Sequence, residues 1–596
     1  MKWLAAGLTF VNLSTVAAFF LALVAGGLGH TTAALALSVG FVTALFAFHQ
    51  TAVTAPGVPN EKSGRHLVNR ACFWLVAAFF AFFAFRSFGW LLYIDGNELR
   101  IQSINNLGDL CLHITYIRNF ASGVPFWPEN PIYFLSHIRY PAGTDLFNAL
   151  LLLSGLDLRH GLIWTALIAS IATFFALYRW GGTFTVAGFL FNGGLVGFQI
   201  LQTGKMLDYQ GDKTIAWKNL ALSMFVTQRG LLYALPAGLL LLYQWRLKHT
   251  RLEGAPPAPL PFWLEVTLYA SMPFFHIHTF LALSLVAAFL FLVGDNASRR
   301  SLAWLVGISF LPATYFVWTI TDHFQARSLL AWSPGWVQTD SDFKMPFLQF
   351  WLLNFGLLPF FVLALVGFVI WRAKKQDKLS FRANPVLAFL TPAALLFLFA
   401  CLVKTAPWAW DNIKLIIWAY LIMLPFLWRE LIVHFALPVR AAICFVLFAS
   451  GAISLLGGLL DHKSGFVLAE RADVDAVGGA VRKLPADARF AAFPTYNHPL
   501  LLQGRKLVLG YLGHVWTQGF DYGEANRELT ALMEGAPNWR ELARTLHARY
   551  LFWGTEEKAN YPKSTRPWEK QAGLVASGNW GAIYDLEAGP QVAPGQ

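Results

Sequence analysis

The feature that most constrains the fold is a series of apolar runs of about 20 residues, the length of helix that crosses the hydrocarbon core of a membrane. The chain has 596 residues, of which 56% are hydrophobic and 13% are charged. Ordinary soluble domains carry about 25% charged residues. Alternation in segments of about 10 residues, which would indicate a transmembrane β-barrel, is not the pattern of these runs. The sequence therefore predicts an α-helical polytopic membrane protein with about 12 to 14 transmembrane helices.

All of the predicted transmembrane segments lie within residues 1–460. The run at the N-terminus lacks a clear cleavage site and is expected to stay as the first helix. In 262–293 we expect two short helices with a turn at the outer face, and in 142–203 the number of spans stays open. The predicted segments are 3–28, 32–54, 71–93, 230–245, 262–293, 302–320, 346–371, 385–403, 413–427 and 438–460, with apolar stretches at 146–156, 161–178 and 183–203.

The charges predict the orientation of the helices. The formal net charge is +12, and much of it lies in short loops such as 56–70 and 372–382, which the positive-inside rule places in the cytoplasm. The charge is therefore no sign of nucleic-acid binding. Loop parity puts the polar loop 95–141 outside. The four cysteines are scattered without CxxC spacing and indicate neither a disulfide framework nor a metal site.

The composition changes after residue 460. Residues 461–596 carry dense charge, turn residues and short mixed segments, which are typical of one soluble α/β domain of normal size. Loop parity places this domain outside as well. We expect helices at 472–484, 522–535 and 538–548, and strands at 489–494, 549–554 and 581–586.

A polar stretch, 105–145, interrupts the apolar sequence. A helix is predicted over 109–121, with Asn106, Asp109, His113 and Tyr116 on one stripe that faces inward. A carboxylate at the start of such a helix can cap it. It can also accept a proton from an acceptor hydroxyl or bind a hard divalent cation. His113, one turn further on, would orient the carboxylate or bind a phosphate.

The pattern GD-LCLH-ITYIRNFASG, then PENP, then RYPAGTD resembles the first outer loop of the GT-C superfamily. These are integral-membrane glycosyltransferases that use polyprenyl-phosphate-linked sugars. The resemblance implies that Asp109, Asp95 and His113 form the catalytic group, with the acid as base or as ligand of a divalent cation, Mg or Mn. Many members carry two nearby acids in this loop. Here the nearest acids are upstream, at Glu98 and Asp95, so the choice between Asp95 and Asp109 stays open.

The resemblance also implies the partners and the location. The donor would be a polyprenyl-phosphate-linked sugar and the acceptor a glycan, lipid or protein. The protein would lie among the lipids of the bacterial inner membrane, with its active site and C-terminal domain extracytoplasmic.

Further ionisable residues gather on the predicted outer face. Lys414 either faces a lipid phosphate or pairs with Asp411 while Trp418 joins an interfacial belt of tryptophans. Arginine can hold phosphate bidentately. His276 and His278 are two residues apart, which does not suit two zinc ligands on one helical face. The substrate-binding candidates are Glu129, His137, Arg139, Arg229, His276, His278, Arg327, Asp411 and Lys414.

Two other functions fit the same composition. A transporter or flippase of lipid-linked glycans would place ionisable groups at mid-membrane and show related halves. The acids here lie mainly at helix ends and no internal repeat is found, which favours the enzyme. The second alternative is a non-catalytic GT-C-like protein of envelope assembly.

Overall fold

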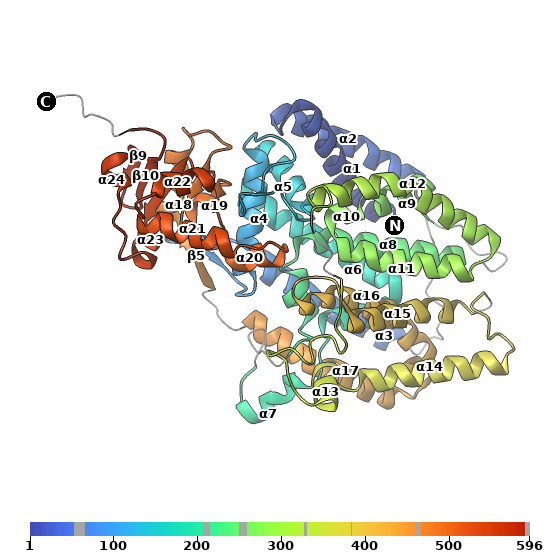
Figure 1. The fold of residues 1–596 in the computed structure, drawn as a ribbon. Helices are drawn as coiled ribbons and strands as arrows, with labels where there is room; N and C mark the ends of the chain where they lie inside the picture. The colour runs from blue at the N-terminus through green and yellow to red at the C-terminus, as the bar shows by residue number, and fades with distance from the viewer. Residues whose placement is uncertain are drawn as a thin grey trace.

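The computed structural model describes residues 1–52, 66–206, 215–249, 259–326, 330–382, 384–460 and 465–589. Long helices form one body, and a smaller α/β region from the end of the chain packs beside it (Figure 1). Helix α4 lies between the two parts, and α19 of the C-terminal region contacts it. The predicted architecture, a polytopic helical protein with a C-terminal α/β region, is confirmed.

The helical body contains eight described helices that are long and apolar enough to cross a membrane, or nine if one bent pair forms a single span. This is fewer than the sequence predicts, because several apolar runs fold as shorter helices. The helices of the body are α1 (Lys2–Ala25), α2 (His30–Gln50), α3 (His66–Phe88), α4 (Asn106–Ala121), α5 (Gly143–Leu153), α6 (Leu158–Leu190), α7 (Ile200–Thr203), α8 (Arg229–His249), α9 (Phe262–Ala270), α10 (Met272–Phe275), α11 (Ile277–Val293), α12 (Asn296–Ile320), α13 (Phe347–Phe355), α14 (Leu358–Lys375), α15 (Pro385–Leu402), α16 (Ile413–Phe426) and α17 (Leu437–Leu460).

Two apolar runs differ from their predicted form. The expected single helix 346–371 is wrong: α13 and α14 meet at an angle of 85°, and Gly356 between them has a φ of 57°. Within the ambiguous 142–203 stretch, α6 is kinked at Gly181 and Gly182, which have non-helical backbone angles. The run 262–293 is divided, but into the three helices α9, α10 and α11 rather than the expected two, with breaks at Ser271 and His276.

The loop between α3 and α4 forms a small sheet with the C-terminal region. The predicted third helix ends at Phe88 rather than at 93, and the chain then enters a hairpin of β1 (Tyr93–Asp95) and β2 (Glu98–Ile101). Strand β5 (Phe466–Glu470) pairs antiparallel with β2. The two parts of the chain therefore share a three-stranded sheet, β1-β2-β5.

A five-stranded mixed sheet, in the order β7-β6-β8-β10-β9, forms the centre of the C-terminal region. The first three strands in this order are parallel, and β10 is antiparallel to both of its neighbours. Each predicted helix and strand of this region has a counterpart in the structure. The elements are β6 (Arg489–Ala491), β7 (Lys506–Leu507), β8 (Tyr550–Gly554), β9 (Gly573–Gly578), β10 (Gly581–Asp585), α18 (Arg471–Val481), α19 (Pro499–Leu502), α20 (Leu512–Thr517), α21 (Gly523–Glu534), α22 (Trp539–Thr545), α23 (Thr555–Asn560) and α24 (Trp568–Gln571); β3 (Ala331–Trp332) and β4 (Val403–Lys404) pair in the helical body.

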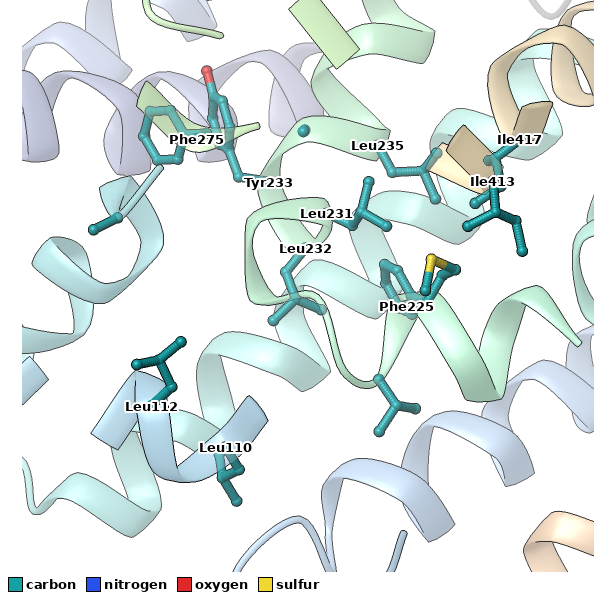
Figure 2. Close-up of a cluster of buried hydrophobic side chains, with 14 of the residues drawn as sticks. Leu110, Leu112, Phe225, Leu231, Leu232, Tyr233, Leu235, Phe275, Ile413 and Ile417 are labelled. Atoms are coloured by element: carbon teal, nitrogen blue, oxygen red, sulfur yellow. The ribbon is translucent and has the colours of Figure 1, made fainter. Parts of the chain in front are cut away.

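Buried apolar side chains hold the start of α4 against the helical body. Leu110 of α4, Leu231 of α8 and Ile413 of α16 belong to one cluster (Figure 2). Leu110 and Ile413 are completely buried. Burial of a leucine or isoleucine side chain contributes about 1.5–3 kcal/mol. Because these anchors adjoin Asp109 and Lys414 in the sequence, the packing brings the two charged side chains into one neighbourhood.

Candidate functional site

Asp109 lies in the first turn of α4, where the positive end of the helix dipole favours a carboxylate. Its side chain is partly exposed. Burial nevertheless raises the pKa of Asp109 from 3.8 to about 6, and Asp411 raises it further, whereas His113 and Lys414 lower it. A carboxyl group with a pKa near 6 is ionised at pH 7 and is basic enough to take a proton.

His113 and Asp145 form a buried pair next to Asp109. The Nδ1 atom of His113 lies 2.9 Å from both carboxylate oxygens of Asp145. The His113 and Asp145 side chains are only 2% and 1% exposed. A carboxylate that holds one ring nitrogen fixes the orientation and tautomer of the imidazole. Asp145 therefore directs the His113 ring on the helix that carries Asp109.

Two tyrosines, Tyr116 on α4 and Tyr140 from the following loop, lie next to each other at the inner stripe of α4. Tyr116 is buried and its hydroxyl accepts a hydrogen bond of 2.8 Å from Gln518 of the C-terminal region. Tyr140 lies beside Tyr116 and His113, with ring centroids 5.6 and 5.7 Å away. Burial, and then the charge of Asp109, raises the pKa of Tyr140 well above its usual range. The predicted inward face of α4 is thus a connected polar surface.

Lys414 lies at the start of α16 and forms a salt bridge of 3.1 Å with Asp411. Both side chains are mostly buried, at 12% and 16% exposure. Lys414 also interacts electrostatically with Asp109, His276 and His278. The structure therefore brings together five candidates from three distant parts of the sequence: Asp109, His276, His278, Asp411 and Lys414.

His276 is held in place by its neighbours on α11. Its Nδ1 atom accepts the backbone N–H of Thr279 at 3.1 Å, and Trp418 donates to the Thr279 hydroxyl at 2.9 Å. Trp418 is fully buried and is not part of an interfacial belt. The Nε2 atom of His276 is buried and has no hydrogen-bond partner among the described residues.

Arg229 opens α8 and is 1% exposed. One of its nitrogens donates to the carbonyl of Leu162 at 3.4 Å, whereas Nε and Nη1 have no partner within the described chain. Its electrostatic partner is Asp145. Gly230 next to it leaves room for the backbone that leads into His276, because a Cβ there would lie only 2.2 Å from the carbonyl oxygen of Phe275. Buried donors without partners are costly, and an anion would satisfy them.

His514 of α20 covers the start of α4. A Cβ on Gly108 would lie 3.3 Å from the Nε2 atom of His514. Burial, and then the charge of His113, lowers the pKa of His514 to about 4. His514 is therefore neutral at pH 7, and the C-terminal region contributes a polar but uncharged group beside Asp109.

Three further candidates take other positions or lie outside the described residues. Asp95 belongs to the β1–β2 hairpin, is 65% exposed, and lies 3.6 Å from Arg100. Glu129 accepts hydrogen bonds of 2.8 Å from Arg489 and 2.7 Å from Lys506, so it attaches the outer loop to the C-terminal region. Arg327 lies outside the described residues.

His137 and Arg139 converge on a different acid, Asp322. The Nδ1 atom of His137 is 3.0 Å from Asp322 Oδ1, and an Arg139 nitrogen donates to Oδ2 at 3.2 Å. Within the described ranges, the group of potential metal ligands is His137, Asp322 and His323. It does not include Asp109. The expected Mg or Mn ion on Asp109 thus finds no set of three ligands there, because His113 Nδ1 is taken by Asp145 and a lysine lies nearby.

Three residues of these clusters, Asp145, Tyr140 and Asp322, were not among the candidates predicted from the sequence. Asp145 and Tyr140 stand within the RYPAGTD stretch that carried the family resemblance, and Asp322 stands directly after an apolar helix. Position in these motifs was the available signal. The pairing itself was not visible, because Asp145 lies 32 residues from its partner His113 and Asp322 lies 185 residues from its partner His137.

No family model matches the sequence, and no curated protein matches it. Two solved structures of the Archaeoglobus fulgidus oligosaccharyltransferase are similar in fold. One is tethered through a disulfide bond to an acceptor peptide containing the NVT sequon: it is 10% identical, has a TM-score of 0.46, and the match covers 87% of this chain and 74% of that one. The other is the apo form, at 11% identity and a TM-score of 0.45, with 87% and 75% covered.

Proposed function

We propose that this chain is a membrane glycosyltransferase that moves a sugar from a polyprenyl-phosphate donor to an acceptor on the extracytoplasmic face. One observation carries the proposal: a partly exposed carboxylate, Asp109, with a pKa of about 6, interacts with Lys414. On the same helix His113 pairs with Asp145, and Asp145 interacts with Arg229, a buried cation with two nitrogens that have no partner among the described residues. This combination provides a base for an acceptor hydroxyl and binding groups for a phosphate.

In the proposed reaction Asp109 accepts the proton of the acceptor O–H group. The acceptor oxygen attacks the anomeric carbon, and the bond from that carbon to the phosphate oxygen breaks. The electron pair leaves with the lipid phosphate, and the proton passes from Asp109 to water. Attack from the face opposite the leaving group inverts the anomeric configuration, for which one base suffices.

The phosphate would be held by Lys414 and Arg229. Lys414 already pairs with Asp411, so its ammonium group would interact with both Asp411 and the phosphate when the donor binds. Arg229 has two buried nitrogens without a described partner, and a guanidinium binds phosphate oxygens in a bidentate manner. His276 Nε2 is a further buried group that a phosphate or sugar oxygen would satisfy. No step requires a metal ion at Asp109.

Transfer of a radiolabelled sugar from polyprenyl-phosphate donors by the purified protein tests the proposal. Asp109→Asn should lower the rate by about 10²- to 10⁴-fold, the usual contribution of a general base. Asp95→Asn and Glu98→Gln in the exposed hairpin serve as matched controls and should leave the rate within about twofold. If Asp95→Asn abolishes transfer and Asp109→Asn does not, the base has been misassigned. If no donor is used at all, the enzyme proposal fails.

The proposed orientation has its own test. We propose a bacterial inner-membrane location, with the site and the 461–596 domain extracytoplasmic and the Lys/Arg-rich loops inside. Ser577 in β9 and Ser380 near the 372–382 loop are both exposed. In intact cells a membrane-impermeant maleimide should label Ser577→Cys and not Ser380→Cys. Labelling of Ser380→Cys and not of Ser577→Cys would show that the orientation is the reverse of the proposed one, and it would leave the proposed reaction unaffected.

A further inference from the structure

A second cluster of polar residues lies apart from Asp109, where the outer loop meets the end of α12. His137, Asp322 and His323 each offer one ligand atom, and these atoms all lie within 4.8 Å of one another. His137 Nδ1 is 3.0 Å and His323 Nδ1 is 3.8 Å from Asp322 Oδ1. The Asp322 side chain is 3% exposed, and the two imidazoles are 43% and 44% exposed. A buried carboxylate thus faces two nitrogen donors at the protein surface.

The backbone after α12 makes this convergence possible. Asp322, His323 and Phe324 have φ angles of 51°, 61° and 61°, in the left-handed region that residues other than glycine rarely adopt. Adjacent side chains in an extended strand point to opposite faces. The left-handed turn instead directs Asp322 and His323 toward the same point, where His137 of the outer loop arrives.

We propose that His137, Asp322 and His323 bind a divalent transition-metal ion of the zinc class. Two imidazole nitrogens and one carboxylate oxygen suit Zn²⁺ or Co²⁺, whereas Mg²⁺ requires oxygen ligands and retains water. Ligands at zinc distances in a tetrahedron lie about 3.3 Å from one another. The two nitrogen–oxygen distances in the cluster, 3.0 and 3.8 Å, lie on either side of that value. The exposed edges of the imidazoles leave the fourth position to water or to a ligand.

Arg139 supports this arrangement. It donates to Oδ2 of Asp322 at 3.2 Å, which leaves Oδ1 directed at the two histidines. The same guanidinium lies over the ring of Phe520, with 4.4 Å from its central carbon to the ring centroid. Partners in the second shell commonly orient a ligating carboxylate in this way. The metal ion would therefore connect the outer loop, the turn after α12 and, through Arg139, the C-terminal region.

The alternative is an arrangement without metal, in which His137 donates Nδ1–H to Asp322 at 3.0 Å and His323, at 3.8 Å, interacts with Asp322 only electrostatically. The two arrangements differ in their affinity for an added metal. The site does not depend on the proposed transfer reaction, and its test needs no substrate.

The test uses the full-length protein, purified in detergent and stripped with EDTA. Co²⁺ should bind with a stoichiometry of one per chain and give the visible absorption bands of a four-coordinate nitrogen–oxygen site, and Zn²⁺ should displace it. His137→Ala, His323→Ala and Asp322→Asn should each weaken binding at least tenfold. His160→Ala is the matched control, because His160 is 46% exposed and pairs with Asp157 without a third ligand. Unchanged Co²⁺ binding in the cluster variants, or no stoichiometric binding in the wild type, would overturn the proposal.

A second measurement uses only the wild-type protein, so it does not depend on how the variants fold. Diethylpyrocarbonate modifies accessible imidazoles, and mass spectrometry locates the modified residues. Zn²⁺ should protect His137 and His323 and leave His160 reactive. Equal reactivity of His137 and His323 with and without Zn²⁺ would contradict metal binding at this cluster.

Discussion

Asp109→Asn should stabilise the protein at pH 7 while it removes transfer activity. The pKa of Asp109 is raised from 3.8 to about 6, chiefly by burial, so the folded state disfavours the carboxylate relative to the unfolded chain. One pKa unit corresponds to about 1.4 kcal/mol. The shift therefore corresponds to a destabilisation of up to about 3 kcal/mol, and the partial exposure of the side chain makes this an upper limit. Asparagine keeps the shape and carries no charge.

The pH dependence distinguishes this explanation from a generic effect of the substitution. An acid with a raised folded-state pKa contributes no penalty below about pH 4, where both states are protonated, and the full penalty above about pH 6. The thermal midpoint of Asp109→Asn in detergent should therefore exceed that of the wild type by a few degrees at pH 7. The difference should shrink steadily toward pH 4.

Glu98→Gln serves as the control for this measurement. Glu98 is 39% exposed and pairs with Arg100 at 2.6 Å, and exposed ion pairs contribute at most about 1 kcal/mol. Its thermal midpoint should stay close to that of the wild type. A lower midpoint for Asp109→Asn at pH 7 would show that the Asp109 carboxylate stabilises the native state. A difference that is independent of pH would show that the charge of Asp109 is not its cause. The reasoning from burial would then be wrong.

Three further predictions follow from the same contacts. The kcat/KM for transfer should fall about tenfold per pH unit below pH 6, because a base with a pKa of about 6 must be ionised; a flat profile down to pH 5 would exclude Asp109 as the base. Lys414→Ala should raise the KM for the donor. It should also move the acidic limb of the pH profile to higher pH, since Lys414 lowers the pKa of Asp109. An acidic limb at the same pH as in the wild type would show that Lys414 does not influence the base. Glu129→Gln should leave kcat unchanged and lower the thermal midpoint slightly, because Glu129 binds Arg489 and Lys506 and is 55% exposed; a loss of transfer with an unchanged midpoint would restore Glu129 as a substrate-binding residue.

The predictions from sequence that the structure confirms concern local patterns. The stripe of Asn106, His113 and Tyr116 on α4 follows from the helical repeat, and all three side chains are buried toward the protein. The break at His276 follows from a proline and two histidines within a long apolar run, whereas the second break, at Ser271, was not expected. Such features depend on residues within one or two turns of each other, which sequence displays directly.

The bend between α13 and α14 could not be predicted in this way. Residues 346–371 are mostly apolar, with Asn354, Gly356 and Pro359 near the bend, and hydropathy alone does not distinguish one helix from two. Gly356 allows the turn through its positive φ. The backbone of Gly194 lies 3.5 Å from the position where a Cβ on Gly356 would be, so a distant segment packs against the turn.

The sequence by itself determined that the chain forms apolar helices, that its polar stretch 105–145 carries an inward-facing helix, and that its C-terminal part is an α/β region. Hydrophobic periodicity and charge decide these properties locally. Only the tertiary structure decided which charges meet: Asp145 with His113, Lys414 with Asp109, and Asp322 with His137. These partners lie tens to hundreds of residues apart in the sequence. Helix packing brings them together, because burial of apolar side chains such as Leu110 and Ile413 positions the first turns of their helices relative to one another.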